Sequence, residues 1–463
     1  MAALEGAPRL RAPRCARRQR SVGIGRRTGR VSRPQPGLAR NSLAVAISGI
    51  ATAGLGLVYW IVVGRMYPAT EVGAAAAIIF AASMLAAFGN LGLGAYFERF
   101  LPVAGPLSLR LLTNGLAVGV LFGGVLAAGF LAFGPVDEMF ADAWQVAFFP
   151  VAVASLSLFA LIDHICIGLQ RAEWSAVKNV VHAVVKLVAA VGVASFLGRQ
   201  GIVATWVVTA LVGAIILWVI VIREIRRRIT TAHPVPPALP PWRAQQRFIV
   251  GNYGIYVANS LTPLLLPMIV IAQVGAGQNA YFAIVWQLIT AVIVLLTMLI
   301  GPYVAEASAG DTDLRHLTYR FIAIMMGVAT ISAVGLATVG PLFLRLAGDD
   351  YADNGTTLLR VCSLALPLAA VGMIFVAVSR VRNRLLPALA AQVAGAVVNL
   401  ALATTLLGGH GLVAVGWSTI CAEALIVVLV IVPLIRAVRE LARTGELTGY
   451  ESVRSTASGA LSK

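Results

Sequence analysis

Two ionisable residues, Lys186 and Glu423, lie well inside long runs of apolar residues, where a charge is costly. Lys186 lies eight residues after Lys178, which is about 12 Å along a helix. Its ammonium group could attract a phosphate into an otherwise apolar region. Glu423 lies far from both ends of its run, and its carboxylate could bind a proton or cation. Both residues are therefore candidates for function.

Each of these residues also has a structural interpretation. Asp163 lies eight residues before Arg171 in the preceding apolar run. If the two runs are antiparallel helices, Asp163 lies at the depth of Lys186, and we expect a salt bridge between them as readily as a functional role. Glu423 could be protonated and hydrogen-bonded to a neighbouring helix, which is the interpretation we favour for it.

Two further polar side chains, Asn399 and Arg360, lie within or at the edge of apolar runs. Asn399 lies midway along an apolar run, where a buried amide most often hydrogen-bonds to another helix. Arg360 lies at the start of its run, where the side chain can extend towards the interface or meet an acidic loop. Our working hypothesis gives substrate contacts to Lys186, Arg99, Arg360 and Asn399 and ion coupling to Glu423 and Asp163.

His164 and His182 have no second metal-binding residue type three or four positions away. We therefore interpret both as hydrogen-bonded core histidines. We expect no metal site, no cofactor and no catalytic residue in this chain.

These side chains must be positioned by membrane-spanning helices. The chain is 59% hydrophobic and only 12% charged, whereas charged residues make up about a quarter of an average soluble domain. Because a spanning helix needs about 20 mostly apolar residues, the sequence predicts an all-α integral membrane protein with twelve spans. They are residues 41–64, 72–96, 108–133, 144–169, 178–198, 201–222, 246–272, 279–303, 317–340, 357–379, 386–407 and 411–435.

The distribution of Lys and Arg predicts the orientation. With alternating sides, 31 of the 36 Lys and Arg lie on one side and three, Arg65, Arg199 and Arg345, on the other. Cytoplasmic loops are enriched in these residues, so both termini are expected inside a plasma membrane. The net charge of +17 follows from this topology and requires no nucleic-acid partner. A basic cytoplasmic rim also favours anionic lipid headgroups.

The longest predicted inside connection contains the cluster Arg226–Arg228 and a Pro-rich stretch, and it divides the spans into six and six. We expect two six-helix lobes around a central cavity. The predicted parts are a basic, disordered cytoplasmic tail (1–40), an N-terminal lobe (41–222), a cytoplasmic linker (223–245), a C-terminal lobe (246–436) and a second cytoplasmic tail (437–463).

An internal repeat is indicated by one offset of 207 residues. Pro68–Gly73 then aligns with Gly275–Ala280, and Gly94–Tyr96 with Gly301–Tyr303. Both matches occupy equivalent places in the two halves. Because each half has an even number of spans, the two lobes would share one orientation in the membrane, as in transporters with parallel repeats.

An enzyme is not expected. No predicted loop exceeds about 25 residues, whereas an independent domain usually needs at least about 50. The acidic loop residues form one outer cluster around Asp137 and another around Asp349. The second cluster could bind a divalent ion, but we favour a solvated loop.

Several motifs of the sequence resemble those of a known protein family. The run Gly64–Gly73, followed by Asn90–Gly94 and Arg99, resembles the start of polysaccharide-biosynthesis flippases, which export O-antigen and teichoic acid. Pro341–Tyr351 with Leu358–Arg360 resembles the turn after the family's ninth span. Asn399–Leu400 and the small residues leading to Glu423 resemble its last two spans. The likeness covers about residues 41–436.

The resemblance implies a transporter of the multidrug/oligosaccharidyl-lipid/polysaccharide exporter superfamily. Its two lobes would rock between inward-open and outward-open states and flip a polyprenyl-pyrophosphate-linked oligosaccharide to the outer leaflet. The implied partners are this lipid-linked substrate, membrane lipids and polysaccharide assembly enzymes, with the protein as a monomer. The alternative is an ion-coupled multidrug or metabolite antiporter of the same fold. The first span lacks the carboxylate that one type of cation-coupled drug extruder uses there, and it lacks the embedded arginines expected of a lipid II flippase. Both differences disfavour these two relatives.

Overall fold

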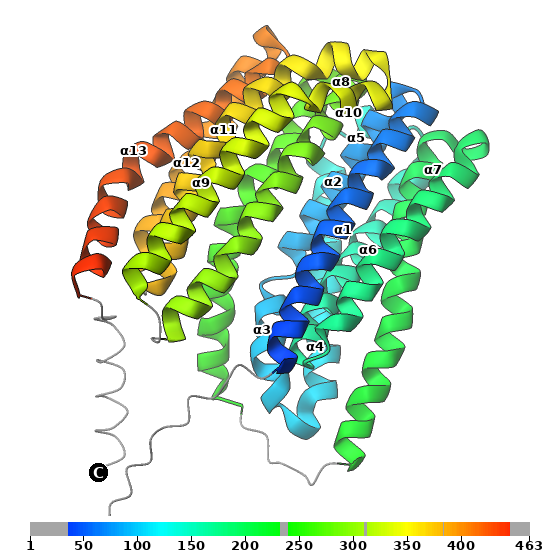
Figure 1. Cartoon of the computed structure of the whole chain (residues 1–463). Helices are drawn as coiled ribbons and strands as arrows, with labels where there is room; N and C mark the ends of the chain where they lie inside the picture. Colours follow the sequence, from blue (N-terminus) through cyan, green and yellow to red (C-terminus); the bar gives the residue numbers. More distant parts are fainter. Residues whose placement is uncertain (1–35, 232–238, 310–312, 383, 445–463) are drawn as a thin grey trace, which may run out of the picture. The chain divides into compact units, whose positions relative to one another are not determined.

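A computed structural model describes residues 36–231, 239–309, 313–382 and 384–444 of the chain. Every regular element in these ranges is a helix (Figure 1). The elements are α1 (Pro36–Met66), α2 (Ala69–Gly89), α3 (Leu93–Phe100), η1 (Leu101–Val103), η2 (Gly105–Leu107), α4 (Ser108–Phe133), α5 (Val136–Met139), α6 (Ala143–Gly168), α7 (Ala172–Thr231), α8 (Trp242–Ala309), α9 (Leu314–Thr338), α10 (Gly340–Ala347), α11 (Asp349–Val381), α12 (Leu386–His410) and α13 (Val413–Thr444).

Eleven helical segments among the described residues are long and apolar enough to cross a membrane. The all-α membrane fold is therefore confirmed, whereas the number twelve stays a prediction. The difference lies in α8, which contains both the seventh and the eighth predicted span. Its backbone leaves the helical conformation at Gly275 (φ 78°), and α7 does the same at Gly198 (φ 46°), so each holds two helical arms.

Several predicted boundaries shift. The second span was expected to reach residue 96, but α2 ends at Gly89 and α3 begins separately at Leu93. Gly92 lies between them with φ 72°, a left-handed conformation that suits glycine. The helices also extend into the predicted linker and C-terminal tail, because α7 continues to Thr231 and α13 to Thr444. The rest of both tails and the linker centre lie outside the described residues.

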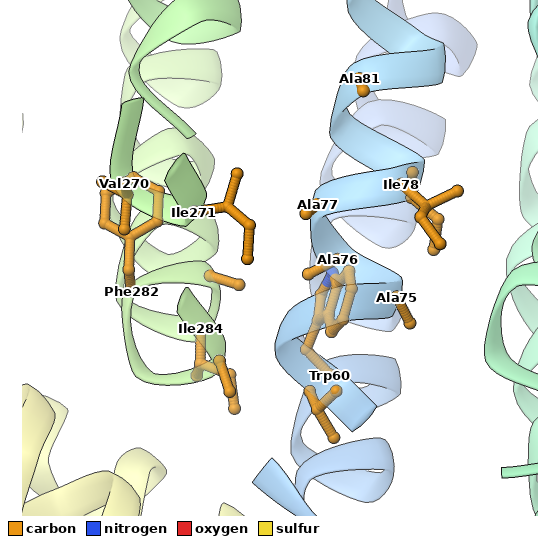
Figure 2. Packing of buried hydrophobic residues seen from close by; sticks show 14 of the residues in the cluster. Trp60, Ala75, Ala76, Ala77, Ile78, Ala81, Val270, Ile271, Phe282 and Ile284 are labelled. Carbon is orange, nitrogen blue, oxygen red and sulfur yellow. The ribbon is translucent and has the colours of Figure 1, made fainter. Parts of the chain in front are cut away.

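Within residues 41–463, α2, α3, α4, α6 and α7 pack against one another, and α8, α9, α11, α12 and α13 form a second set of contacts. The two sets meet most extensively between α2 and α8. Figure 2 shows the alanine-rich surface of α2 near Val270, Ile271, Phe282 and Ile284 of α8. Small residues allow two helix backbones to approach closely in a membrane.

α2 and α8 approach each other closely at two segments that the repeat makes equivalent. A Cβ atom at Gly73 would lie 1.6 Å from the Ala276 carbonyl oxygen and 2.9 Å from the backbone nitrogen of Ala280. Ala280 is the residue that the offset of 207 aligns with Gly73. The Asn279 side chain, which is fully buried, donates a hydrogen bond to the Gly73 carbonyl oxygen (2.8 Å). Contact between equivalent positions is expected near a pseudo-two-fold axis.

Candidate functional site

A cavity of about 720 Å³ lies among α1, α2, α3, α6 and α7. Its wall combines polar side chains with aromatic rings, as binding cavities commonly do. We call it the N-half cavity. Its polar and aromatic lining residues are Thr52, Ser83, Asn90, Glu98, Phe159, His164, Asn179, His182, Lys186 and Trp206.

Lys186 lines this cavity although its side chain is almost fully buried (5% exposed). Its Nζ atom lies 3.3 Å from the centroid of the Trp206 ring and 5.0 Å from that of Tyr59. These contacts stabilise the ammonium group through cation–π attraction. Among the described residues no carboxylate lies within ion-pair distance of Lys186. An anionic ligand in the cavity would meet an ammonium group that has no acidic partner in the described part of the chain.

The expected salt bridge between Asp163 and Lys186 is wrong. Asp163 pairs instead with Lys178, whose Nζ lies 2.7 Å from Oδ1. The Ser175 hydroxyl donates to the same oxygen (2.6 Å), and the Asn179 amide donates to Oδ2 (3.1 Å). Lys178 also donates to the Phe159 carbonyl oxygen (2.5 Å). The fifth span was predicted to begin at residue 178, but α7 already begins at Ala172, so Lys178 rather than Lys186 lies at the depth of Asp163.

We expect Asp163→Asn to lower the free energy of unfolding in detergent by about 3 kcal/mol, because it leaves the buried Lys178 ammonium unpaired. Ser175→Ala, which removes one neutral hydrogen bond, should cost about 1 kcal/mol. Adding Lys178→Met to Asp163→Asn should restore part of the loss. Equal effects of Asp163→Asn and Ser175→Ala would contradict this structural role. Ion coupling by Asp163 stays a prediction.

The two histidines differ in their surroundings. His182 is buried (9% exposed), packs its ring on Phe159 with centroids 4.6 Å apart, and lies 3.3 Å from the Trp206 carbonyl oxygen. The prediction of a hydrogen-bonded core histidine is thus confirmed for His182. His164 is half-exposed in the N-half cavity, and its Nδ1 lies 2.7 Å from Oε1 of Glu98. No group of three metal-binding residues occurs in the described part of the chain.

Glu98, Asn90 and Asn179 were missed as cavity residues. The sequence placed Asn90 inside a continuous second span and Glu98 just beyond its end. The break at Gly92 instead lets α3 bring Glu98 to the wall of the cavity. The signal that could have revealed it was the sequence Asn90–Gly94, because its two glycines interrupt an otherwise apolar helix.

A second cavity of about 400 Å³ lies among α8, α11, α12 and α13. We call it the C-half cavity. Glu423 and Asn399 both line it, together with Arg380 and Gln392. Asn399 accepts a hydrogen bond from the Ser418 hydroxyl (2.9 Å) and donates one to Thr419 (3.5 Å). The predicted interhelical role of Asn399 is therefore present, between α12 and α13.

Three predicted site residues line neither cavity: Asp163, described above, Arg99 and Arg360. Arg99 is exposed at the end of α3, with its guanidinium carbon 4.6 Å from the centroid of the Phe248 ring. Arg360 is exposed and donates from Nε to the Ala337 carbonyl oxygen (3.2 Å). This bond places a cation at the C-terminal end of α9, where the helix dipole favours it. Substrate contact by either residue stays a prediction.

The acidic cluster around Asp349 also has a structural role. Asp349 and Asp350 form the first turn of α11 rather than part of a loop. Carboxylates stabilise a helix N-terminus by interaction with its dipole.

Solved transporter structures share this fold. An inward-closed lipid II flippase, MurJ, matches with a TM-score of 0.64 at 12% identity, over 87% of this chain and 90% of that one. An inward-facing multidrug resistance transporter of the MATE family, in the MOP superfamily, matches with a TM-score of 0.61 at 14% identity, over 88% and 100%. A MOP superfamily transporter from Pyrococcus furiosus gives 0.54 at 13%, over 89% and 98%. The fold is therefore that of this class of membrane transporter.

A match to a protein-family model identifies the family of the chain. Residues 38–307 match the model described as polysaccharide biosynthesis protein. The chain belongs to this family, and the resemblance seen in the sequence is confirmed. Among curated proteins no match was found.

Proposed function

We propose that the protein flips a polyprenyl-pyrophosphate-linked oligosaccharide from the inner to the outer leaflet of the plasma membrane for cell-surface polysaccharide assembly. The observation that carries this proposal is Lys186, a buried ammonium group that lines a polar cavity and has no acidic partner among the described residues. A pyrophosphate headgroup must cross about 30 Å of hydrocarbon, where an isolated charge is strongly disfavoured. A cationic, polar cavity lowers that barrier.

The contact pattern supports movement by alternating access. The two contact sets described above support a division into two lobes, proposed here as residues 41–222 and 246–436. Each set encloses a cavity of its own, and the sets meet between α2 and α8. In this proposal the lobes rock about that contact, with both termini cytoplasmic. The protein acts as a monomer and works with polysaccharide assembly enzymes.

Translocation in proteoliposomes tests the function. The purified protein would be reconstituted with a polyprenyl-pyrophosphate oligosaccharide, and a lectin or fluorescent probe would measure headgroup movement between leaflets. Protein-free vesicles are the control. We expect protein-dependent movement. No movement with several lipid-linked glycans would overturn the proposal.

A second candidate is an ion-coupled multidrug or metabolite antiporter. Glu423, which lines the C-half cavity, favours it, because a carboxylate there can bind a proton or cation and attract cationic solutes. Proton-driven or sodium-driven efflux of small cations from the same proteoliposomes, without glycan translocation, would establish this alternative.

Glu423 is also the group that we propose couples glycan transport to an ion gradient. In Glu423→Gln we expect the stimulation of translocation by an imposed proton or sodium gradient to disappear, because an amide cannot exchange a proton or balance a cation. Gln392→Ala, which changes another polar residue of the same cavity, should keep the stimulation. Unaltered gradient dependence in Glu423→Gln would remove Glu423 from the mechanism.

A further inference from the structure

We propose that the N-half cavity has two chemically distinct ends, one cationic and one that binds sugar hydroxyl groups, and that it therefore selects neutral glycans over acidic ones. The cationic end is Lys186. The hydroxyl-binding end consists of Glu98 and His164, with Asn179 and Asn90 between the two ends. This inference rests on the proposed function and adds to it the orientation of the substrate and the class of sugar accepted.

The hydroxyl-binding end has hydrogen-bonding capacity left over. Glu98 uses Oε1 to bind His164 Nδ1 at 2.7 Å, and the two side chains are 37% and 45% exposed. No hydrogen bond between described residues occupies Oε2 of Glu98 or Nε2 of His164. Contact with Gly94 fixes the imidazole further, because a Cβ atom there would lie 2.6 Å from its Cδ2 atom. The pair thus lines the cavity with two polar atoms that have no hydrogen-bond partner among the described residues.

The two asparagines add one donor and one acceptor. Asn90 accepts from the Ser157 hydroxyl through Oδ1 (2.5 Å), which orients its NH₂ group as a donor for a ligand. Asn179 donates through Nδ2 to Asp163, which leaves its Oδ1 as an acceptor. A sugar hydroxyl both donates and accepts hydrogen bonds, so it matches this mixture. A pyrophosphate only accepts, so it matches Lys186.

The distance between the ends follows from the packing of α6 on α7. The His182 and Phe159 rings are in contact at 4.6 Å, so these residues lie at one depth. Lys186 is four residues beyond His182, and His164 is five residues beyond Phe159 in the opposite direction. Nine residues at 1.5 Å each separate the ends by roughly 13 Å along the helices. A short glycan attached to a pyrophosphate can therefore contact both.

The proposed orientation of the substrate agrees with the predicted topology of the protein in the membrane. His164 and Glu98 lie towards Arg99, at the end that the Lys and Arg distribution predicts to be cytoplasmic. Lys186 lies deeper, towards the hydrocarbon in which the polyprenyl chain must stay. The pyrophosphate joins that chain to the glycan, so a substrate with its phosphates at Lys186 directs its sugars to Glu98.

Selectivity follows from the carboxylate of Glu98. A neutral sugar offers hydroxyl donors to Oε2, whereas the carboxylate of an acidic sugar offers only acceptors and adds like charge. An acidic sugar should therefore bind more weakly than a neutral sugar at this end of the cavity.

Binding to the full-length protein in detergent tests the inference. Calorimetry would compare three compounds with one polyprenyl pyrophosphate: a neutral hexose disaccharide, the same disaccharide with a uronic acid, and no sugar. We expect wild-type protein to bind the neutral compound about tenfold more tightly than the acidic one. In Glu98→Gln the two affinities should agree within about twofold, while the affinity for the sugar-free compound is unchanged. Gln keeps an acceptor for His164, so the pair can still form.

The matched control is Glu173→Gln. Glu173 is a partly exposed carboxylate that pairs with Arg171 at 3.6 Å and does not line the cavity, so its loss should leave the tenfold ratio intact. Equal wild-type affinities for the neutral and acidic compounds, or an unchanged ratio in Glu98→Gln, would overturn the inference. Binding with this ratio but no translocation in proteoliposomes overturns only the proposed function. If none of the three compounds binds, both fail.

Discussion

Lys186→Met is expected to slow translocation of a lipid-linked oligosaccharide by about 10- to 100-fold, the effect of losing one buried hydrogen bond to a charged group. Lys186 is 5% exposed and is held by the rings of Trp206 and Tyr59. Methionine keeps much of the volume of the side chain and can pack on the same rings. The fold should therefore survive, and only the positive charge is lost. The measurement is the initial rate of headgroup movement in proteoliposomes.

Arg345→Met is the matched control for Lys186→Met. It also removes one positive charge, but from an exposed position in the last turn of α10. Its rate should stay within about twofold of wild type. Normal translocation by Lys186→Met would remove Lys186 from the substrate site and, with it, the observation on which the proposed function rests.

Gly73→Ala should slow translocation by about tenfold, because the added methyl group forces α2 and α8 apart. The Cβ position lies 1.6 Å from the Ala276 carbonyl oxygen, which is backbone and cannot rotate away. Overpacking of this kind costs about 1–3 kcal/mol. That cost falls on conformations in which α2 and α8 are in contact, so the variant shifts the population away from them.

A cysteine reporter would detect the shift. Ala77 is fully buried on α2, so Ala77→Cys should react slowly with a maleimide in wild-type background and faster when Gly73→Ala is added. Gly124→Ala is the control, because no atom lies within 4 Å of its Cβ position. Equal labelling rates with and without Gly73→Ala would show that the α2–α8 contact does not limit movement.

Several features of the fold could be predicted because membrane helices have a strong local signal. A run of about 20 apolar residues is needed to satisfy the backbone inside a bilayer. The prediction of 108–133 coincides with α4, and that of 144–169 differs from α6 by one residue at each end. The break at Gly92 was missed, since a short irregular segment interrupts hydrophobicity too little to show in a long window.

The partner of Asp163 was predicted incorrectly because the sequence placed the start of the fifth span too late, at residue 178 instead of Ala172. Counting residues from Arg171 and Lys178 gave Asp163 and Lys186 similar depths. Because α6 ends at Gly168 and α7 begins at Ala172, Lys178 lies at the depth of Asp163, and the packing of α6 on α7 joins the two side chains. Glu98 and His164 are likewise 66 residues apart in sequence, so no local pattern could pair them.

The sequence by itself therefore determined the class of molecule, the approximate position of most apolar helices and the family, because hydrophobic length and family motifs are local properties. It also singled out Lys186, Glu423 and Asn399, since a polar residue in an apolar run is visible without a structure. Only the tertiary structure decided which charges are paired and which side chains line a cavity. The reason is that pairing and lining depend on how helices rotate and pack against one another, and those contacts join residues far apart in the chain.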